Sequence, residues 1–166
     1  IQVRASAMRQ RHDHRFGDVR ERDRHDTQFA ETSVVHEAGA TQAIFGAAVQ
    51  RDAYRSRTFP GFDYSFTVPA VFVQGEHQAT PDLTLAASAR VDFHDRYGTR
   101  VSPRLSALYT PGPMTFRLSA GRGFFAPTPF VEETEAAGLS RLAPLVGLRA
   151  EKSGSVGCWE WQVTQR

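Results

Sequence analysis

Cysteine, lysine and long apolar runs are nearly missing from this chain of 166 residues. Cys158 is the only cysteine, so no internal disulfide can form, and the sequence lacks the Cys/His pattern of a zinc site. No stretch approaches the roughly 18 apolar residues of a membrane-spanning helix, and the mean hydropathy is −0.41. These shortages exclude an α-helical membrane protein. They do not exclude a transmembrane β-barrel, whose alternating strands look average in bulk.

Arginine supplies almost all of the positive charge, because Lys152 is the only lysine. The formal net charge is only +2, and acids are interleaved with bases, as in the run from Arg20 to Arg24. A surface that binds nucleic acid carries clustered positive charge with few acids among it, so we expect no nucleic-acid partner. No nucleophile elbow or other catalytic constellation stands out. The sequence therefore predicts a protein that is not an enzyme and carries no cofactor.

A period of two dominates the stretch from Leu83 to His94. Its odd positions are all apolar, whereas its even positions are small, polar or charged. Because successive side chains of a strand point to opposite faces, this pattern predicts a strand with one apolar face. Its length also suits a tilted membrane strand, which needs about 9–11 residues.

The same alternation recurs from Val101 to Tyr109 and from Met114 to Arg122. Weaker patterns predict further strands at residues 1–9, 27–37, 43–51 and 68–78. Each of the three clear segments carries an arginine among its polar positions, and these are Arg90, Arg104 and Arg117. Strands of soluble proteins alternate in the same way. The lengths of the connections are therefore needed to distinguish a membrane barrel from a soluble β-sandwich.

The expected connections differ in length in a regular order. Long links are expected at residues 9–26, 51–66 and 124–153, an intermediate one at 95–100, and tight ones near 38–40, 80–82 and 111–113. This order is typical of an up-and-down membrane barrel, whereas a Greek-key sandwich has no reason to sort its loops. We therefore expect an all-β, antiparallel up-and-down transmembrane β-barrel segment. It should form an open, curved sheet of about six or seven strands with little enclosed core.

Several short motifs lie between Asp82 and Glu151. They are LTLAASARVD at 83–92, YGT at 97–99, VSPRL at 101–105, FRLSAGRGF at 116–124 and APT at 126–128, followed by Glu132. Together they resemble the barrel domain of TonB-dependent receptors, in which an arginine strand ends in Gly-Phe and an Ala-Pro-Thr loop. The match is best over residues 82–151 and looser over 27–80.

The resemblance implies a receptor in the outer membrane of a Gram-negative-type bacterium, surrounded by outer-membrane lipid. Such a receptor imports a small-molecule nutrient, such as a ferric siderophore or another metal chelate, with energy from the TonB complex acting through a plug. We expect residues 1–166 to be part of the barrel domain, with the signal peptide, the plug and the C-terminal strands outside the chain. The alternatives are a passive porin-like barrel and a soluble β-sandwich that acts as a binding module.

Five residues are candidates for contacting the ligand from the lumen or a loop: Arg90, Asp92, Arg104, Arg117 and Arg122. Under the barrel hypothesis, arginines on the polar face would form a wall that meets the plug or an anionic ligand. The alternative is that such arginines and carboxylates simply pair and keep a wet wall hydrated. Asp92 is a candidate partner for one of the arginines.

A second, weaker group of candidates lies in the first expected loop and comprises His12, His14 and His25. Imidazole combined with nearby carboxylates, here Asp13 and Asp26, can bind a transition metal. The alternative is an ordinary solvated loop, because spacing in a loop does not fix geometry. The sequence predicts no dedicated metal site, and it assigns no role to Cys158 or to the tail at 152–166.

Overall fold

The computed structural model describes residues 1–130, 138–156 and 160–163. Its strands are β1 (Gln2–Phe16), β2 (Val19–Ala38), β3 (Thr41–Ser56), β4 (Tyr64–Thr80), β5 (Leu83–His94), β6 (Gly98–Tyr109), β7 (Met114–Phe125), β8 (Glu151–Val156) and β9 (Glu160–Val163). Two single 3₁₀ turns accompany them, η1 (Pro60–Phe62) and η2 (Leu139–Arg141). Within the described residues, no helix is long and apolar enough to cross a membrane.

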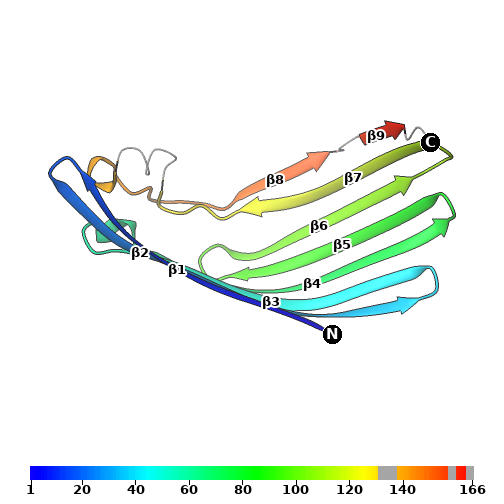
Figure 1. Cartoon of the computed structure of the whole chain (residues 1–166), viewed down its shortest axis with the longest axis horizontal. Coiled ribbons are helices and arrows are strands. Elements are labelled where there is room, and N and C mark those ends of the chain that lie inside the picture. The colour runs from blue at the N-terminus through cyan, green and yellow to red at the C-terminus, as the bar shows by residue number, and fades with distance from the viewer. Residues whose placement is uncertain (131–137, 157–159, 164–166) are drawn as a thin grey trace.

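All strands belong to one antiparallel sheet that follows the order of the chain from β1 to β8 (Figure 1). Strand β8 pairs with residues 120–125 of β7, and β9 pairs with residues 114–117 of the same strand. The all-β, up-and-down prediction is confirmed. The sheet has more strands than the expected six or seven, because the C-terminal residues also pair with β7.

The connections sort to two ends of the sheet. One end, the turn end, carries the tight links at residues 39–40, 81–82 and 110–113. The opposite end, the loop end, carries the links at residues 17–18, 57–63, 95–97 and 126–150. The expected alternation of tight turns and longer loops is thus present, with one exception at residues 17–18.

The exception is the polar segment 9–26, for which a long loop was predicted. That prediction is wrong, because β1 and β2 stay paired in register up to Phe16 and Val19 and are joined by a two-residue turn at Gly17 and Asp18. Gly17 has a φ of 63°, which a tight hairpin turn requires and glycine adopts without strain. Pairing satisfies the backbone groups of both strands even where both faces are polar, so the hairpin needs no apolar face here.

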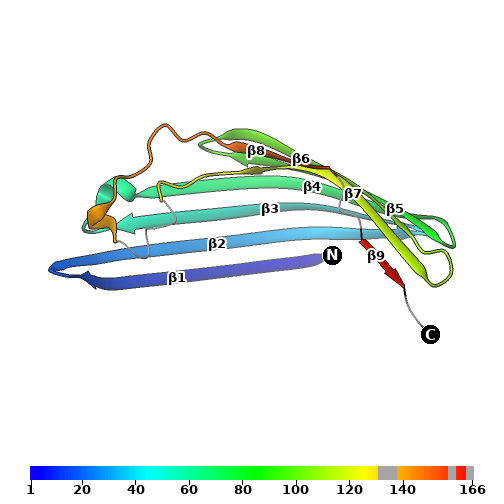
Figure 2. The same cartoon turned by 90° about the horizontal axis from the view of Figure 1, so that it is seen from above.

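The sheet is curved, and we call its two sides the concave and the convex face (Figure 2). The odd-numbered apolar side chains of β5 and β6 and the even-numbered ones of β7 lie on the convex face. Leu85, Leu105 and Phe116 remain 44%, 64% and 43% exposed there. In the described part of the chain nothing packs over them as a second layer, which contradicts the sandwich alternative.

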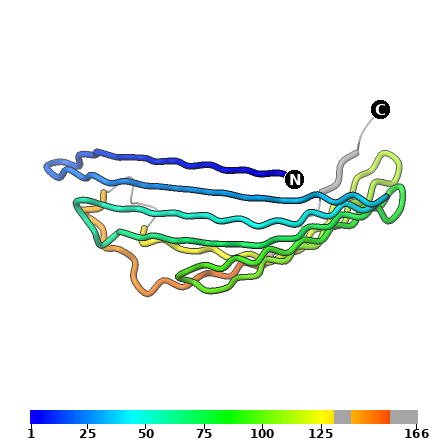
Figure 3. Tube along the Cα trace, turned by 90° about the horizontal axis from the view of Figure 1, so that it is seen from below, coloured from blue at the N-terminus to red at the C-terminus, as the bar shows by residue number. Residues whose placement is uncertain are grey.

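The height of the apolar convex band fits a bilayer. From Leu83 to Phe93 the strand advances roughly 33 Å at about 3.3 Å per residue. At the tilt of ~40° usual for membrane barrels, this becomes about 25 Å, which is the height of the lipid-facing band of such barrels. The tube trace in Figure 3 shows the N-terminal strand β1 along one edge of the sheet.

The small hydrophobic core lies at the loop end. It contains Tyr54, Phe62, Tyr64, Phe66, Tyr97 and Leu139. These residues come from β3, β4 and three of the loop-end links, so the core ties the loops to the sheet. The rest of the sheet encloses little, as expected for an open segment.

Candidate ligand-binding surface

The polarity of the two faces is reversed at the loop end. In the middle of β3 and β4, apolar side chains such as Val49 and Val71 lie on the convex face. Closer to the loop end the convex positions of β3 become Arg51 and Arg55, while the aromatic side chains of Tyr54, Tyr64 and Phe66 occupy the concave face. On the concave side the loop end therefore carries aromatic side chains, which are buried in the loop-end core.

The aromatic rings form a continuous contact. The ring of Tyr64 stacks on Phe66 with centroids 4.9 Å apart and on Tyr54 at 6.1 Å. Phe130, from the link between β7 and β8, meets Tyr54 edge-on at 4.6 Å. The hydroxyl of Tyr97 donates a hydrogen bond to the carbonyl of Pro127 over 2.6 Å, which anchors the same link. Offset stacks and edge-on pairs of this kind favour a fixed arrangement of rings.

A polar trio lies beside the rings. Nε2 of His25 is 2.6 Å from Oδ1 of Asp52, and the hydroxyl of Tyr64 donates to the same oxygen over 3.3 Å. Burial raises the pKa of Tyr64 above its ordinary value, and the negative charge of Asp52 raises it further. Burial and the nearby Asp23 raise the pKa of Tyr54 in the same way. Both phenols therefore stay neutral and can donate hydrogen bonds at any physiological pH.

The predicted arginine wall continues the concave face toward the turn end. Nε of Arg90 donates a hydrogen bond of 2.7 Å to Oδ1 of Asp92. Asp92 itself is only 6% exposed. This confirms that Asp92 partners one of the arginines. Arg104 and Arg117 lie on the same face and are exposed. Their predicted contact with a ligand stays a prediction.

Two open hollows lie along this wall. The first, of about 210 Å³, is lined among others by Glu31, Phe72, Gln74, Ser88, Arg90 and Ser102. The second, of about 590 Å³, is lined mainly by small residues around Arg104, including Ser88, Ser102, Ser119, Gly121, Gly123 and Ser153. Small side chains leave room for a ligand or another protein segment next to the guanidinium groups.

Arg122 differs from the other candidates. It lies five positions after Arg117, and an odd separation in a regular strand places two side chains on opposite faces. The unbroken register of β7 against β6 and β8 therefore assigns Arg122 to the convex side, with Leu118 and Ala120. Arg122 nevertheless borders the hollow around Arg104, and its predicted contact with a ligand stays a prediction.

The three candidate histidines lie in strands and not in a loop. The register puts His12, His14 and His25 on the concave side of β1 and β2. Nδ1 of His12 is 2.7 Å from Oδ1 of Asp23, whereas His25 pairs with Asp52. Among the described residues, no group of three metal-ligating side chains could hold a metal ion. His12 and His25 thus pair with separate carboxylates, and the three histidines do not converge on one site.

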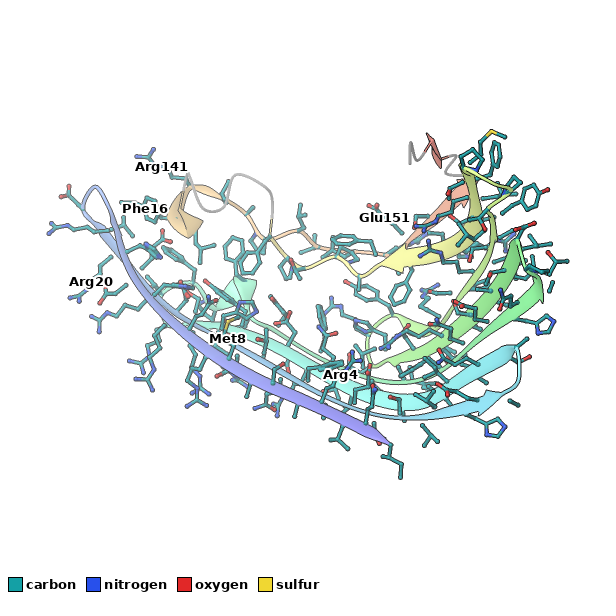
Figure 4. The ribbon with its side chains drawn as sticks, turned by 45° about the vertical axis from the view of Figure 1, so that its right-hand side comes forward. Arg4, Met8, Phe16, Arg20, Arg141 and Glu151 are labelled. Atoms are coloured by element: carbon teal, nitrogen blue, oxygen red, sulfur yellow. The ribbon has the colours of Figure 1, made fainter. Side chains whose placement is uncertain are left out.

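A long-range contact fixes the link between β7 and β8. The carboxylate of Glu21, in β2, accepts hydrogen bonds of 2.9 Å from the backbone N–H groups of Leu139 and Ser140. Figure 4 shows Phe16 and Arg141 at this corner. The contact holds η2 against the loop end of β2, so the link passes over the concave face.

Sequence reasoning missed Asp52, Tyr54, Tyr64 and Glu21 as site residues. The first three were hidden because residues 51–66 were assigned to a link. A signal was present, since the even positions Tyr54, Tyr64 and Phe66 are aromatic while Arg51 and Arg55 are charged. The contact of Glu21 with η2 joins residues more than a hundred positions apart, and no local pattern could reveal it. Glu132 and Cys158, singled out from the sequence, lie outside the described residues.

Comparison with known proteins decides the family. Residues 4–153 match the family model described as TonB dependent receptor-like, beta-barrel. The chain belongs to the TonB-dependent receptor β-barrel family. A search of curated protein sequences gave no match.

Among solved structures, this receptor barrel chain is similar to the siderophore receptor PirA from Pseudomonas aeruginosa, with a TM-score of 0.74 and 20% sequence identity. The match covers 99% of this chain and 32% of that receptor. The chain therefore spans about a third of the length of PirA. At this identity the likeness shows the fold alone.

Proposed function

We propose that this chain forms part of an outer-membrane receptor that takes up a ferric siderophore or a similar scarce nutrient, with energy supplied by TonB. The observation that carries the proposal is the match to the receptor barrel family over residues 4–153. In this proposal the loop end is extracellular, the convex face meets lipid, and the concave face lines the lumen.

The concave face supports an anionic ligand. The rings of Tyr54, Tyr64 and Phe66 are buried in the loop-end core and fix the shape of the extracellular mouth. Deeper in the lumen, Arg90, Arg104 and Arg117 supply guanidinium groups, which favour carboxylate and similar oxygen-rich anions. A ferric chelate with carboxylate donors would use these guanidinium contacts.

The uptake proposal is tested with the full-length protein in a bacterial host that lacks its own ferric-chelate receptors. Uptake of radiolabelled iron would be measured from ferric catecholate, hydroxamate and carboxylate chelates, in hosts with and without functional TonB. We expect uptake of at least one chelate, and only in the host with TonB. Equal uptake without TonB would support the passive porin alternative and overturn the proposal.

The role of the polar trio is tested by Tyr64→Phe in the same protein. The substitution keeps the ring but removes the hydroxyl that donates a hydrogen bond to Asp52, and the loss of this support for the half-buried Asp52 and His25 should weaken chelate binding by up to about tenfold. The matched control is Tyr109→Phe, which makes the same chemical change to a tyrosine on the convex face, away from the proposed binding surface. Equal affinity of Tyr64→Phe and wild type would show that the hydrogen bond from Tyr64 to Asp52 does not support binding.

A further inference from the structure

Arginines are concentrated on the convex face at the loop end of β1, β2 and β3. The register puts eight of them on this face: Arg9, Arg11, Arg15, Arg20, Arg22, Arg24, Arg51 and Arg55. All eight are exposed, and the same surface contains only two acids, Asp13 and Asp26. We call this surface the basic patch. It is confined to these strands, because β4, β5 and β6 carry Ser65, Thr67, Phe93 and Thr99 at the corresponding convex positions.

The basic patch begins where the apolar band ends. Ala5, Ala30, Val49 and Pro69 form one cross-strand row of the band. Two rows further toward the loop end, Arg9 stands beside Asp26. Arg51 lies two residues beyond Val49, which is about 7 Å along the strand and ~5 Å along the membrane normal at a tilt of ~40°. That is the level of lipid headgroups, just outside the hydrocarbon core.

Some charges in the patch are already compensated. Arg20 donates a 2.7 Å hydrogen bond to Asp13, which lowers the pKa of that carboxyl below its ordinary value and keeps it ionised. Asp26 accepts hydrogen bonds from Arg9, over 2.7 Å, and from Arg24. Both aspartates are therefore occupied, and neither is left to neutralise the remaining arginines.

Other arginines stand directly opposite one another, and among the residues that the structure describes only one of these, Arg24, has a carboxylate partner. Arg11, Arg24 and Arg55 stand directly opposite one another on three adjacent strands, and we call them the arginine row. Like charges at directly opposite positions destabilise a strand pair. In the described part of the chain, neither Arg11 nor Arg55 forms an ion pair with a carboxylate. An external anion that bridges the row would relieve this repulsion.

We propose that the basic patch binds phosphorylated headgroups of lipid in the outer leaflet, with the arginine row at its centre. Four observations agree with this occupant: the excess of positive charge, its continuity with the lipid-facing band, its position at headgroup level, and the use of arginine in a chain with one lysine. Arginine binds phosphate through two parallel hydrogen bonds, whereas lysine acts as a point charge. The inference rests on the proposed function only in that the convex face meets a membrane.

The test uses the full-length protein in nonionic detergent and the double variant Arg11→Gln/Arg55→Gln. Binding is measured to mixed micelles that contain phosphatidic acid, with phosphatidylcholine micelles and inorganic phosphate as separate probes. The matched control is Arg141→Gln/Arg149→Gln, which removes two equally exposed arginines outside the patch. We expect the double variant to bind phosphatidic acid micelles about tenfold more weakly than wild type and the control to bind like wild type. The wild-type affinity should also fall as salt is added.

Three results would overturn the proposal: unchanged binding by the double variant, an equal loss in the control, or inorganic phosphate bound as tightly as the lipid micelles. Unfolding in lipid-free nonionic detergent is a second readout. Because the double variant removes like-charge repulsion, its stability there should equal or exceed that of wild type. A clear loss of stability would instead assign the row a structural role.

The iron-uptake experiment fails or succeeds independently, since it depends on the concave face and on TonB.

Discussion

Arg90 and Asp92 form a partly buried polar contact in the concave wall. The carboxylate of Asp92 lies in a residue that is only 6% exposed, and it accepts a hydrogen bond of 2.7 Å from Arg90. A buried carboxylate that loses its donor retains the cost of its own desolvation. Arg90 therefore matters for the stability of the sheet as well as for the charge of the lumen.

Arg90→Ala should lower the free energy of unfolding of the full-length protein in lipid by about 1–3 kcal/mol. Arg104→Ala removes the same positive charge from the same face. Arg104 is exposed, so its loss should change stability by less than about 0.5 kcal/mol. A denaturant titration into lipid vesicles measures both variants. Equal destabilisation by the two substitutions would show that the Arg90–Asp92 contact contributes no more to stability than an exposed arginine does.

At the scale of elements, η2 is joined to the rest of the sheet by a compact contact. Gly138, which precedes η2, has a φ of 76°, a conformation that favours glycine. A Cβ at this position would also come within 2.7 Å of the ring of Phe16 and 2.9 Å of the carboxylate of Glu21. Both the backbone conformation and the close neighbours at this corner therefore favour glycine over any larger residue.

Gly138→Ala should detach η2 from β2 and expose the link to protease. Trypsin cleavage after Arg141, which is already exposed, should then become faster by about tenfold, because the local opening loses two hydrogen bonds to Glu21. Gly147→Ala is the matched control, since Gly147 also has a positive φ of 68° but nothing within 4 Å of an added Cβ. Identical cleavage rates for the two variants would contradict a specific contact at η2.

The elements show what the sequence could and could not predict. Strands β5, β6 and β7 were predicted closely, because their apolar side chains alternate strictly with polar or small ones. Strands β1 and β2 were predicted too short, since their outer portions have polar side chains on both faces and only pairing defines them. The polar wall of Arg90, Arg104 and Arg117 followed from the same alternation. The trio of His25, Asp52 and Tyr64 did not, because it depends on which strands are neighbours.

For the whole molecule, the open sheet has consequences for stability. Strand β1 lies at one edge of the sheet (Figure 2) and presents unpaired backbone groups there. The convex face exposes a broad apolar surface. Exposed edges and large apolar patches favour aggregation in water. The 166-residue chain expressed without detergent should therefore be aggregated or unfolded. A monodisperse protein that melts cooperatively, measured by light scattering and calorimetry, would contradict the account of an open barrel segment.

The central claim is that alternate side chains of successive strands face lipid and water, and two neighbouring residues of β6 test it directly. Leu105 is 64% exposed in the middle of the convex band, whereas Ser106 lies on the concave face opposite Ala86 and Ser119. In folding titrations of the full-length protein into lipid, Leu105→Arg should cost about 2–4 kcal/mol, as for a lipid-facing arginine near the midplane. Ser106→Arg should cost far less, because its guanidinium stays in water. Equal costs for the two variants, or a larger cost at Ser106, would contradict the assignment of the two faces.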